Sequence, residues 1–371
     1  MAESTRQPET APGGSARAPA RGPLFRFQKP MNSVVLAASP AALGAVYFFG
    51  WRSLAVIVVS VLVAVLCEWL FCRARPAPVS WAVFVTALLF ALTLPPGVPW
   101  HVIVVCAAVA IVFGKEVFGG FGRNVFNPAL VGRCFVYVCF PVAMTGRWPV
   151  PFGGWPGGFA GWVNTVDATT AATPLKLLHE GGSVDVARLF LGSVGGSMGE
   201  TSALLILLGG AYLLIRRVAN WRIVVATLAS AAVTAAFFHY LLGVARVAPP
   251  LANLLDGGMM FGAVFMATDP ISAPQTDEAR YLYGAGIGFL AVVIRGFGQF
   301  SCGVMFSILF MNMFAPIMDY AVRAWKKRRK AAAAATAAAP GAAPPASESE
   351  SAAAETQSGS DAPASESEAA P

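Results

Sequence analysis

Residues 52–72 read RSLAVIVVSVLVAVLCEWLFC, and this nearly unbroken apolar stretch decides the class of fold. A helix of about 20 apolar residues crosses the hydrocarbon core of a bilayer. Similar runs recur between residues 33 and 322. Across the chain 56% of residues are hydrophobic and 12% are charged, whereas soluble domains carry about 25% charged residues. The sequence therefore predicts an all-α polytopic membrane protein and excludes an ordinary soluble enzyme.

The apolar runs divide into about ten predicted transmembrane helices, separated by Pro, Gly and charged residues. They lie near residues 33–50, 52–72, 78–95, 98–118, 124–144, 200–216, 221–243, 257–271, 281–296 and 299–322. Two of them are interrupted by proline, at Leu94-Pro95-Pro96 and at Thr268-Asp269-Pro270. Breaks at membrane depth occur where they are buried in protein or line a cavity, so we expect these two to be internal.

Basic residues predict the orientation of the spans. Lys and Arg gather before the first predicted span, after the second, fourth and tenth, and between the sixth and seventh. With ten spans, all of these clusters fall on one side, which the positive-inside rule assigns to the cytoplasm of a bacterial inner membrane. The net charge of +7 is spread between apolar runs and forms no single patch, so it does not indicate nucleic-acid binding.

The same pattern predicts the domain organisation. Residues 1–30 form a disordered cytoplasmic tail, and residues 31–144 form a first five-helix repeat. Residues 145–199 form an external loop segment, and residues 200–322 form a second five-helix repeat. Residues 323–371 combine a basic anchor with a low-complexity cytoplasmic tail of Ala, Pro, Ser and Glu.

Three local patterns recur in the same order in the two predicted repeats. Trp51-Arg52 returns as Trp221-Arg222, Thr93-Leu94-Pro95 as Thr268-Asp269-Pro270, and Gly120-Phe121-Gly122 as Gly296-Phe297-Gly298. A repeat of five spans forces its two copies into opposite orientations. Inverted repeats with broken helices near the midplane are typical of transporters, so the proline-broken spans are expected to face a central path.

The external segment contains the pattern Asp167-Ala168-Thr169-Thr170-Ala171-Ala172-Thr173. Small neighbours leave its hydroxyl groups accessible to a modifying enzyme or a large cofactor. The alternative is a helix cap, in which Asp or Thr precedes a turn at residues 174–179.

This pattern closely resembles the covalent flavinylation motif Asp-x-x-(Ser/Thr)-Gly-Ala-Thr and differs from it at Ala171. Further stretches are similar to blocks of the same family, at residues 119–130, 199–203, 267–270 and 312–319. The family comprises RnfD of the Rnf electron-transport complex and NqrB of the Na⁺-translocating NADH:quinone reductase. The resemblance covers about residues 30–322 and implies ten helices in a urea-transporter-like inverted repeat.

The resemblance implies that Thr173 carries FMN through a phosphoester bond made by a periplasmic flavin transferase. Asp167, Thr169 and Thr170 would assist the transferase or hold the phosphate. A second flavin, riboflavin, is implied near Arg123, Asn124 and Asn127. For these three the alternative is a helix cap or an amide bond between helices.

Four acids near span ends are candidates for an ion path, because intramembrane acids usually mark one: Asp269, Glu116, Glu200 and Asp319. The alternative is solvation, or pairing with Lys115, Arg123 or Arg323.

Three functions follow from these patterns. The first is a redox subunit that relays electrons and couples them to Na⁺ or H⁺ movement, with the other Rnf or NQR subunits, and quinone in the second type, as partners. The form of the 170–175 stretch and the chain length favour the Rnf type, which exchanges electrons between ferredoxin and NAD. The others are a channel of urea-transporter type and a structural anchor with a degenerate motif.

Overall fold

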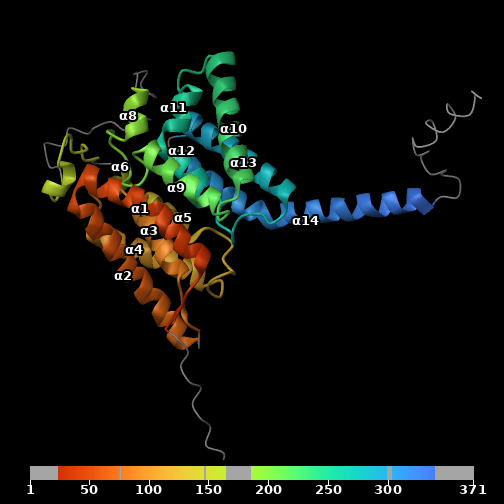
Figure 1. Cartoon of the computed structure of the whole chain (residues 1–371), viewed down its shortest axis with the longest axis horizontal. Coiled ribbons are helices and arrows are strands. Elements are labelled where there is room, and N and C mark those ends of the chain that lie inside the picture. Colours follow the sequence, from red (N-terminus) through yellow and green to blue (C-terminus); the bar gives the residue numbers. More distant parts are fainter. Residues whose placement is uncertain (1–23, 76, 146–147, 164–184, 299–302, 339–371) are drawn as a thin grey trace, which may run out of the picture. The chain divides into compact units, whose positions relative to one another are not determined.

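The computed structural model describes residues 24–75, 77–145, 148–163, 185–298 and 303–338 (Figure 1). The chain forms two units, Met1–Val322 and Arg323–Pro371. The α-helices are α1 (Lys29–Phe49), α2 (Trp51–Ala74), α3 (Ala82–Leu92), α4 (Trp100–Ile111), α5 (Pro128–Cys139), α6 (Pro141–Thr145), α8 (Val186–Leu191), α9 (Ala203–Ile215), α10 (Trp221–Ala236), α11 (Pro250–Leu255), α12 (Gly257–Phe261), α13 (Asp277–Phe297) and α14 (Gly303–Ala338).

The remaining elements are short. Three π-helical turns, η1 (Val112–Glu116), η3 (Phe237–Leu241) and η4 (Gly262–Met266), extend α4, α10 and α12, and η2 (Gly157–Ala160) is a 3₁₀ turn. Two-residue strands β1 (Phe25–Arg26) and β2 (Val79–Ser80) pair in parallel. The last part of α14 belongs to the second unit, where Lys326–Lys330 form an exposed basic stretch.

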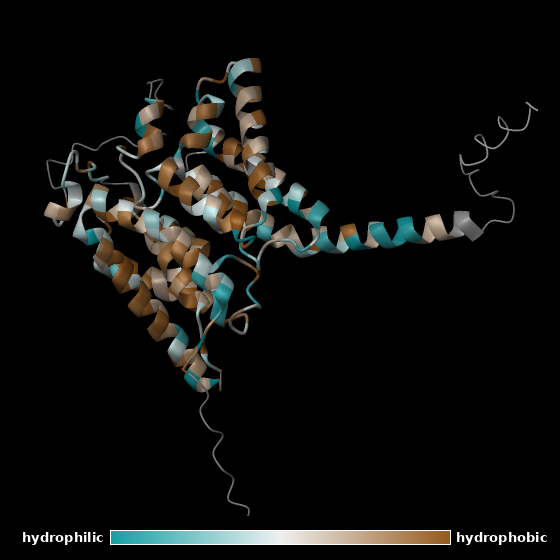
Figure 2. Ribbon diagram, in the orientation of Figure 1, coloured by the Kyte–Doolittle hydropathy of each residue, from teal (hydrophilic) through white to brown (hydrophobic). Residues whose placement is uncertain are grey.

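Four helices of the described residues are long and apolar enough to cross a membrane: Lys29–Phe49, Trp51–Ala74, Trp221–Leu241 and Gly303–Ala334. Figure 2 shows most of α2 in the brown of hydrophobic residues, and Leu62, Leu66 and Leu70 on this helix are more than half exposed. Exposed leucines at this spacing are expected of a surface that faces lipid rather than water. The prediction of an all-α membrane protein is confirmed in this general form.

Each of the ten predicted spans overlaps a helix, but several of these helices are short. For example, the predicted span 78–95 contains only α3, which ends at Leu92. Pro95 and Pro96 cannot donate backbone hydrogen bonds and cannot continue the helix. Residues far along the chain satisfy the carbonyls left open at this end. Gly199 N–H donates to Leu92 O at 2.7 Å, and Met198 N–H donates to Leu94 O at 3.0 Å.

The three recurring sequence patterns occupy partly matching places. Trp51 and Trp221 each begin a helix. Thr93 follows α3 and donates its hydroxyl to Phe90 O, while Thr268 follows η4 and donates its hydroxyl to Val264 O. The third pair differs, because Gly122 has a left-handed φ of 90° and Gly298 has a φ of −81°. The ten membrane crossings and the inverted repeat stay predictions.

The first unit has one main hydrophobic core to which both predicted repeats contribute. It includes Phe49 of α1, Leu89 of α3, Ile206 of α9, Phe265 of η4 and Ile287 of α13. The α1 and α9 helices lie side by side, and Gly209 of α9 permits this approach, because a Cβ there would lie 2.1 Å from Ala37 O. The two predicted repeats are therefore packed as one body.

Candidate functional site

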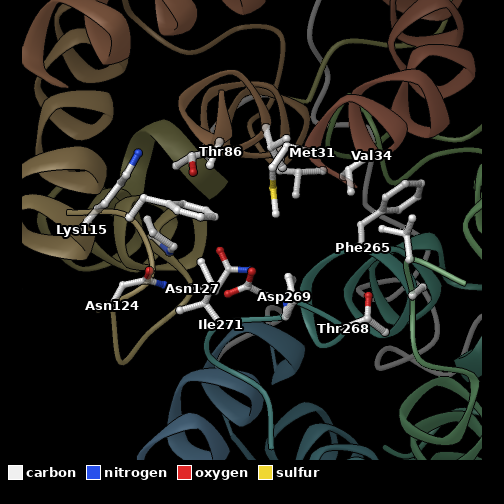
Figure 3. Close-up of a pocket in the computed structure, with 18 of the residues that line it drawn as sticks. Met31, Val34, Thr86, Lys115, Asn124, Asn127, Phe265, Thr268, Asp269 and Ile271 are labelled. Carbon is white, nitrogen blue, oxygen red and sulfur yellow. The ribbon is translucent and has the colours of Figure 1, made fainter. Parts of the chain in front are cut away.

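A polar cavity lies where α1, α3, η1 and the residues after η4 meet (Figure 3). Figure 3 shows Asn124, Asn127 and Asp269 along one side of the cavity, with Thr86 and Met31 opposite. Its volume is about 50 Å³. A buried water needs about 10–15 Å³ measured in this way, so the cavity has room for a few waters or a partly hydrated ion. An isoalloxazine ring would need its walls to move.

Asn127 links the two predicted repeats. Its Oδ1 accepts a hydrogen bond from Ala129 N–H at 3.0 Å and so caps α5, while its Nδ2 donates to Met266 O at 3.1 Å. Asn is a preferred N-cap residue, and Pro128 fits the first helical position because that position needs no N–H donor. Met266 ends η4, so the cap of α5 also fixes the end of a broken helix from the other predicted repeat.

The other two residues implied for riboflavin differ from each other. Asn124 is buried, lines the cavity and donates from Nδ2 to Phe126 O at 3.0 Å. Arg123 is exposed and lies over Gly119, where an added Cβ would come within 3.0 Å of its Cδ. The structure therefore brings two of the three residues to the cavity.

Asp269 stands in the segment after η4 and lines the cavity. Its Oδ2 accepts hydrogen bonds from the N–H of Ser272 at 3.2 Å and from its hydroxyl at 2.7 Å. These bonds hold the carboxylate close to the Asn127 cap in a proline-broken segment. This is the arrangement that an ion path requires of a polar group at membrane depth.

Glu116 belongs to a buried charge cluster beside the same cavity. It accepts a hydrogen bond from Arg75 at 2.6 Å. Its neighbour Lys115, which lines the cavity, donates from Nζ to Glu68 Oε2 at 2.5 Å and to Ser80 Oγ at 2.6 Å. Glu68 and Lys115 are each only 2% exposed. A fully buried pair of this kind is costly to leave incomplete.

The other two candidate acids lie elsewhere in the fold. Glu200 forms a double hydrogen bond with Arg133 of α5, one of whose contacts is 3.1 Å long. Asp319 of α14 accepts hydrogen bonds from Gln275 N–H at 2.8 Å and from Thr276 N–H at 2.8 Å. Asp319 therefore holds the start of α13, where an anion also favours the helix dipole.

Sequence reasoning missed several of these residues. Glu68, Arg133 and Arg295 are buried charges, and Arg295 pairs with Asp256 at 3.0 Å. Each of the three lies inside a predicted span, and an ionisable residue in such a span is itself a signal of function. The pairing of Glu200 with Arg133 joins residues distant in the chain, and no sequence spacing indicated it.

The predicted flavin residues Asp167, Thr169, Thr170 and Thr173 lie outside the described residues. The segment before them, residues 148–163, is held on the corner between α1 and α2. Trp51 N–H donates to Gly161 O at 3.1 Å, its Nε1 donates to Phe159 O at 2.9 Å, and Phe152 N–H donates to Phe48 O at 2.7 Å. The chain therefore leaves a fixed anchor shortly before the motif.

Comparison with known proteins identifies relatives along most of the chain. The sequence model of the NQR2, RnfD, RnfE family matches residues 22–327. The chain is 40% identical over 292 residues to the B subunit of the Na(+)-translocating NADH-quinone reductase of Pseudomonas aeruginosa, an alignment that covers 75% of this chain and 68% of that protein. It is 35% identical over 342 residues to the D subunit of the ion-translocating oxidoreductase complex of Halorhodospira halophila, covering 85% and 94%. It is also 35% identical over 305 residues to the D subunit of the proton-translocating ferredoxin:NAD(+) oxidoreductase complex of Clostridium ljungdahlii, covering 78% and 88%.

Proposed function

The chain belongs to the NQR2, RnfD, RnfE family, and we propose that it is the FMN-carrying membrane subunit of an ion-translocating electron-transport complex. The observation that carries this proposal is the 167–173 pattern, found in a chain whose family match runs from residue 22 to residue 327. The names of its relatives describe subunits of ion-translocating oxidoreductases, and they support the same function for this chain.

FMN would be attached through a phosphoester to the Thr173 hydroxyl. The flavin supplies the redox chemistry, and the protein supplies its position and electrostatic surroundings. The anchored segment 148–163 supports this assignment, because it ends ten residues before Thr173. At about 3.3–3.6 Å per extended residue, the attachment point stays within about 35 Å of the α1–α2 corner. On the predicted topology this corner faces the external side, where a periplasmic flavin transferase works.

Ion movement would use the polar cavity on the opposite side of the predicted membrane. Asp269 provides a carboxylate, and Asn127 fixes the broken segment beside it. Lys115 lines the cavity while bonded to Glu68, so a change in charge within the cavity would be felt directly by the buried pair. Asn124 and Asn127 are also the residues that would hold riboflavin in an expanded form of this cavity. Amide groups match the donor and acceptor edge of a flavin ring.

The Rnf type is favoured over the NADH:quinone reductase type by length. The alignment covers 94% of the Halorhodospira relative and 68% of the Pseudomonas relative. The higher identity to the latter, 40% against 35%, is the observation that keeps the NQR type as the second candidate. Reconstitution with ferredoxin or with NADH and quinone as electron donor and acceptor separates the two, and Na⁺ dependence identifies the coupling ion.

Flavin attachment is tested by producing the full chain together with its flavin transferase. We expect the band on a denaturing gel to fluoresce under ultraviolet light, because a phosphoester survives denaturation. Thr173→Ala removes the only proposed attachment oxygen and should abolish the fluorescence. Thr170→Ala is the matched control and should keep it. A dark wild-type band, obtained with a transferase shown to modify another substrate, would contradict the proposal.

A further inference from the structure

A second pocket lies beside the polar cavity, between the α9–α10 connection and residues 268–275. Its volume is about 530 Å³, and Thr268, Asp269 and Pro270 belong to the walls of both spaces. Three arginines line it, together with two amide side chains: Arg217, Arg222, Arg280, Asn220 and Gln275. On the predicted topology this pocket opens toward the cytoplasm, where arginine-rich pockets between helices recognise anionic head groups.

Two of the arginines are held in place by one carboxylate. Arg222 Nη1 lies 3.0 Å and Arg280 Nη1 lies 2.9 Å from Asp277 Oδ1, and Arg280 Nε donates to Pro274 O at 3.1 Å. A single carboxylate cannot neutralise two guanidinium groups. The other acid at the pocket, Asp269, already accepts two hydrogen bonds from Ser272. Three guanidinium groups therefore face two carboxylates, and the pocket keeps a positive charge.

Arg217 is placed at the pocket by an unfavourable backbone conformation. Its φ of 55° is the only positive value of a non-glycine residue in the described part of the chain. Arg217 N–H donates to Leu214 O at 3.0 Å and Val218 N–H donates to Leu213 O at 2.9 Å, which is the Schellman ending of α9. The residue at this left-handed position is usually Gly, because a Cβ is disfavoured there. An arginine at such a position is therefore a candidate for function rather than for folding.

We propose that the Arg217–Arg222–Arg280 pocket binds a phosphate-bearing anion. Guanidinium groups form paired hydrogen bonds with phosphate oxygens, and the pocket offers three of them on different elements. The phosphate can come from the head group of an anionic phospholipid or from a soluble phosphate compound. The rim favours the lipid, because Trp221 and Tyr281 pair there while 51% and 42% exposed, as aromatic residues do at head-group level.

The test measures thermal unfolding of the full chain in neutral detergent. Phosphatidylglycerol is added in mixed micelles, with phosphatidylcholine as the uncharged comparison, and sodium phosphate is compared in parallel with sodium chloride of equal ionic strength. We expect phosphatidylglycerol to raise the unfolding midpoint to a saturating value. If sodium phosphate raises the midpoint alone, the site is built for a soluble phosphate compound.

Arg217→Gly separates binding from folding. It removes one charge-assisted contact and should weaken phosphatidylglycerol binding at least about tenfold. The same change relieves the left-handed backbone, so the midpoint without lipid should stay equal or rise. Arg216→Ala is the matched control, because Arg216 is exposed, adjacent and outside the pocket lining, and it should keep wild-type binding.

Three results would overturn the proposal. They are no response to either anion, an equal loss of binding in Arg216→Ala and Arg217→Gly, and unchanged binding in Arg217→Gly. The second would show that diffuse surface charge attracts the anion. The readout is independent of flavin attachment, so these results cannot be confused with failure of the FMN assignment.

Discussion

Breaking the Glu68–Lys115 pair is predicted to destabilise the protein strongly, whereas replacing both residues is predicted to restore most of the loss. The two side chains are 2% exposed, and Lys115 Nζ lies 2.5 Å from Glu68 Oε2. Lys115→Met leaves a buried carboxylate that keeps only the N–H and hydroxyl of Ser80 as donors. Removal of one partner of a buried ion pair costs about 3–5 kcal/mol, mainly because the other charge remains desolvated.

The neighbouring Glu116 predicts which single variant suffers more. Glu116 interacts electrostatically with both members of the pair. Lys115→Met leaves two carboxylates near one another with Arg75 as the nearby cation, so its cost should lie at the upper end of the range. Glu68→Gln leaves Lys115 beside Glu116 and should lie at the lower end. The double variant contains no unpaired charge from this pair and should cost less than about 2 kcal/mol, a coupling of at least about 3 kcal/mol.

The free energy of unfolding is to be measured by titrating the full chain in mixed micelles with sodium dodecyl sulfate and following far-ultraviolet circular dichroism. Lys327→Met is the control, because this exposed lysine of α14 should change stability by less than about 0.5 kcal/mol. If the two single costs simply add in the double variant, Glu68 and Lys115 do not depend on each other, and the buried-pair reasoning is refuted.

Two further changes test how the site is held in place. Asn127→Ala removes both the α5 cap and the bond to Met266 O, so it should cost about 1–3 kcal/mol in the same titration; a cost near zero would show that this link is unimportant. Gly158→Ala places a Cβ 2.3 Å from Val46 O and should loosen the 148–163 anchor, measured as faster limited proteolysis, whereas Gly153→Ala meets nothing within 4 Å and should behave as wild type. Equal proteolysis of the two variants would contradict the anchor.

The long helices of the fold could be predicted from composition alone. The predicted span 52–72 became α2, Trp51–Ala74, because no proline or charge cluster interrupts the apolar run. The span 78–95 was harder, because proline ended α3 at Leu92 and a distant segment around Gly199 covered its open end. Local patterns show where a helix must stop, but they do not show which residues complete it.

The candidate site was predictable in part for the same reason. Asn124, Asn127 and Asp269 were singled out from motifs, and the structure gathers them around one cavity. Their functional roles stay predictions. The partners of the buried acids, such as Arg133 for Glu200, depend on how helices from both halves pack. Charges within apolar runs were visible in the sequence, and Glu68 shows that every one of them merits consideration before the fold is known.

The central claim is that Thr173 carries FMN, and intact-mass measurement followed by peptide mapping tests it most directly. Full-length protein made with the flavin transferase should gain the mass of one FMN less one water, and the added mass should map to Thr173. Protein made without the transferase should lack it. An unmodified Thr173 peptide, or a flavin attached to a different residue, would contradict the account.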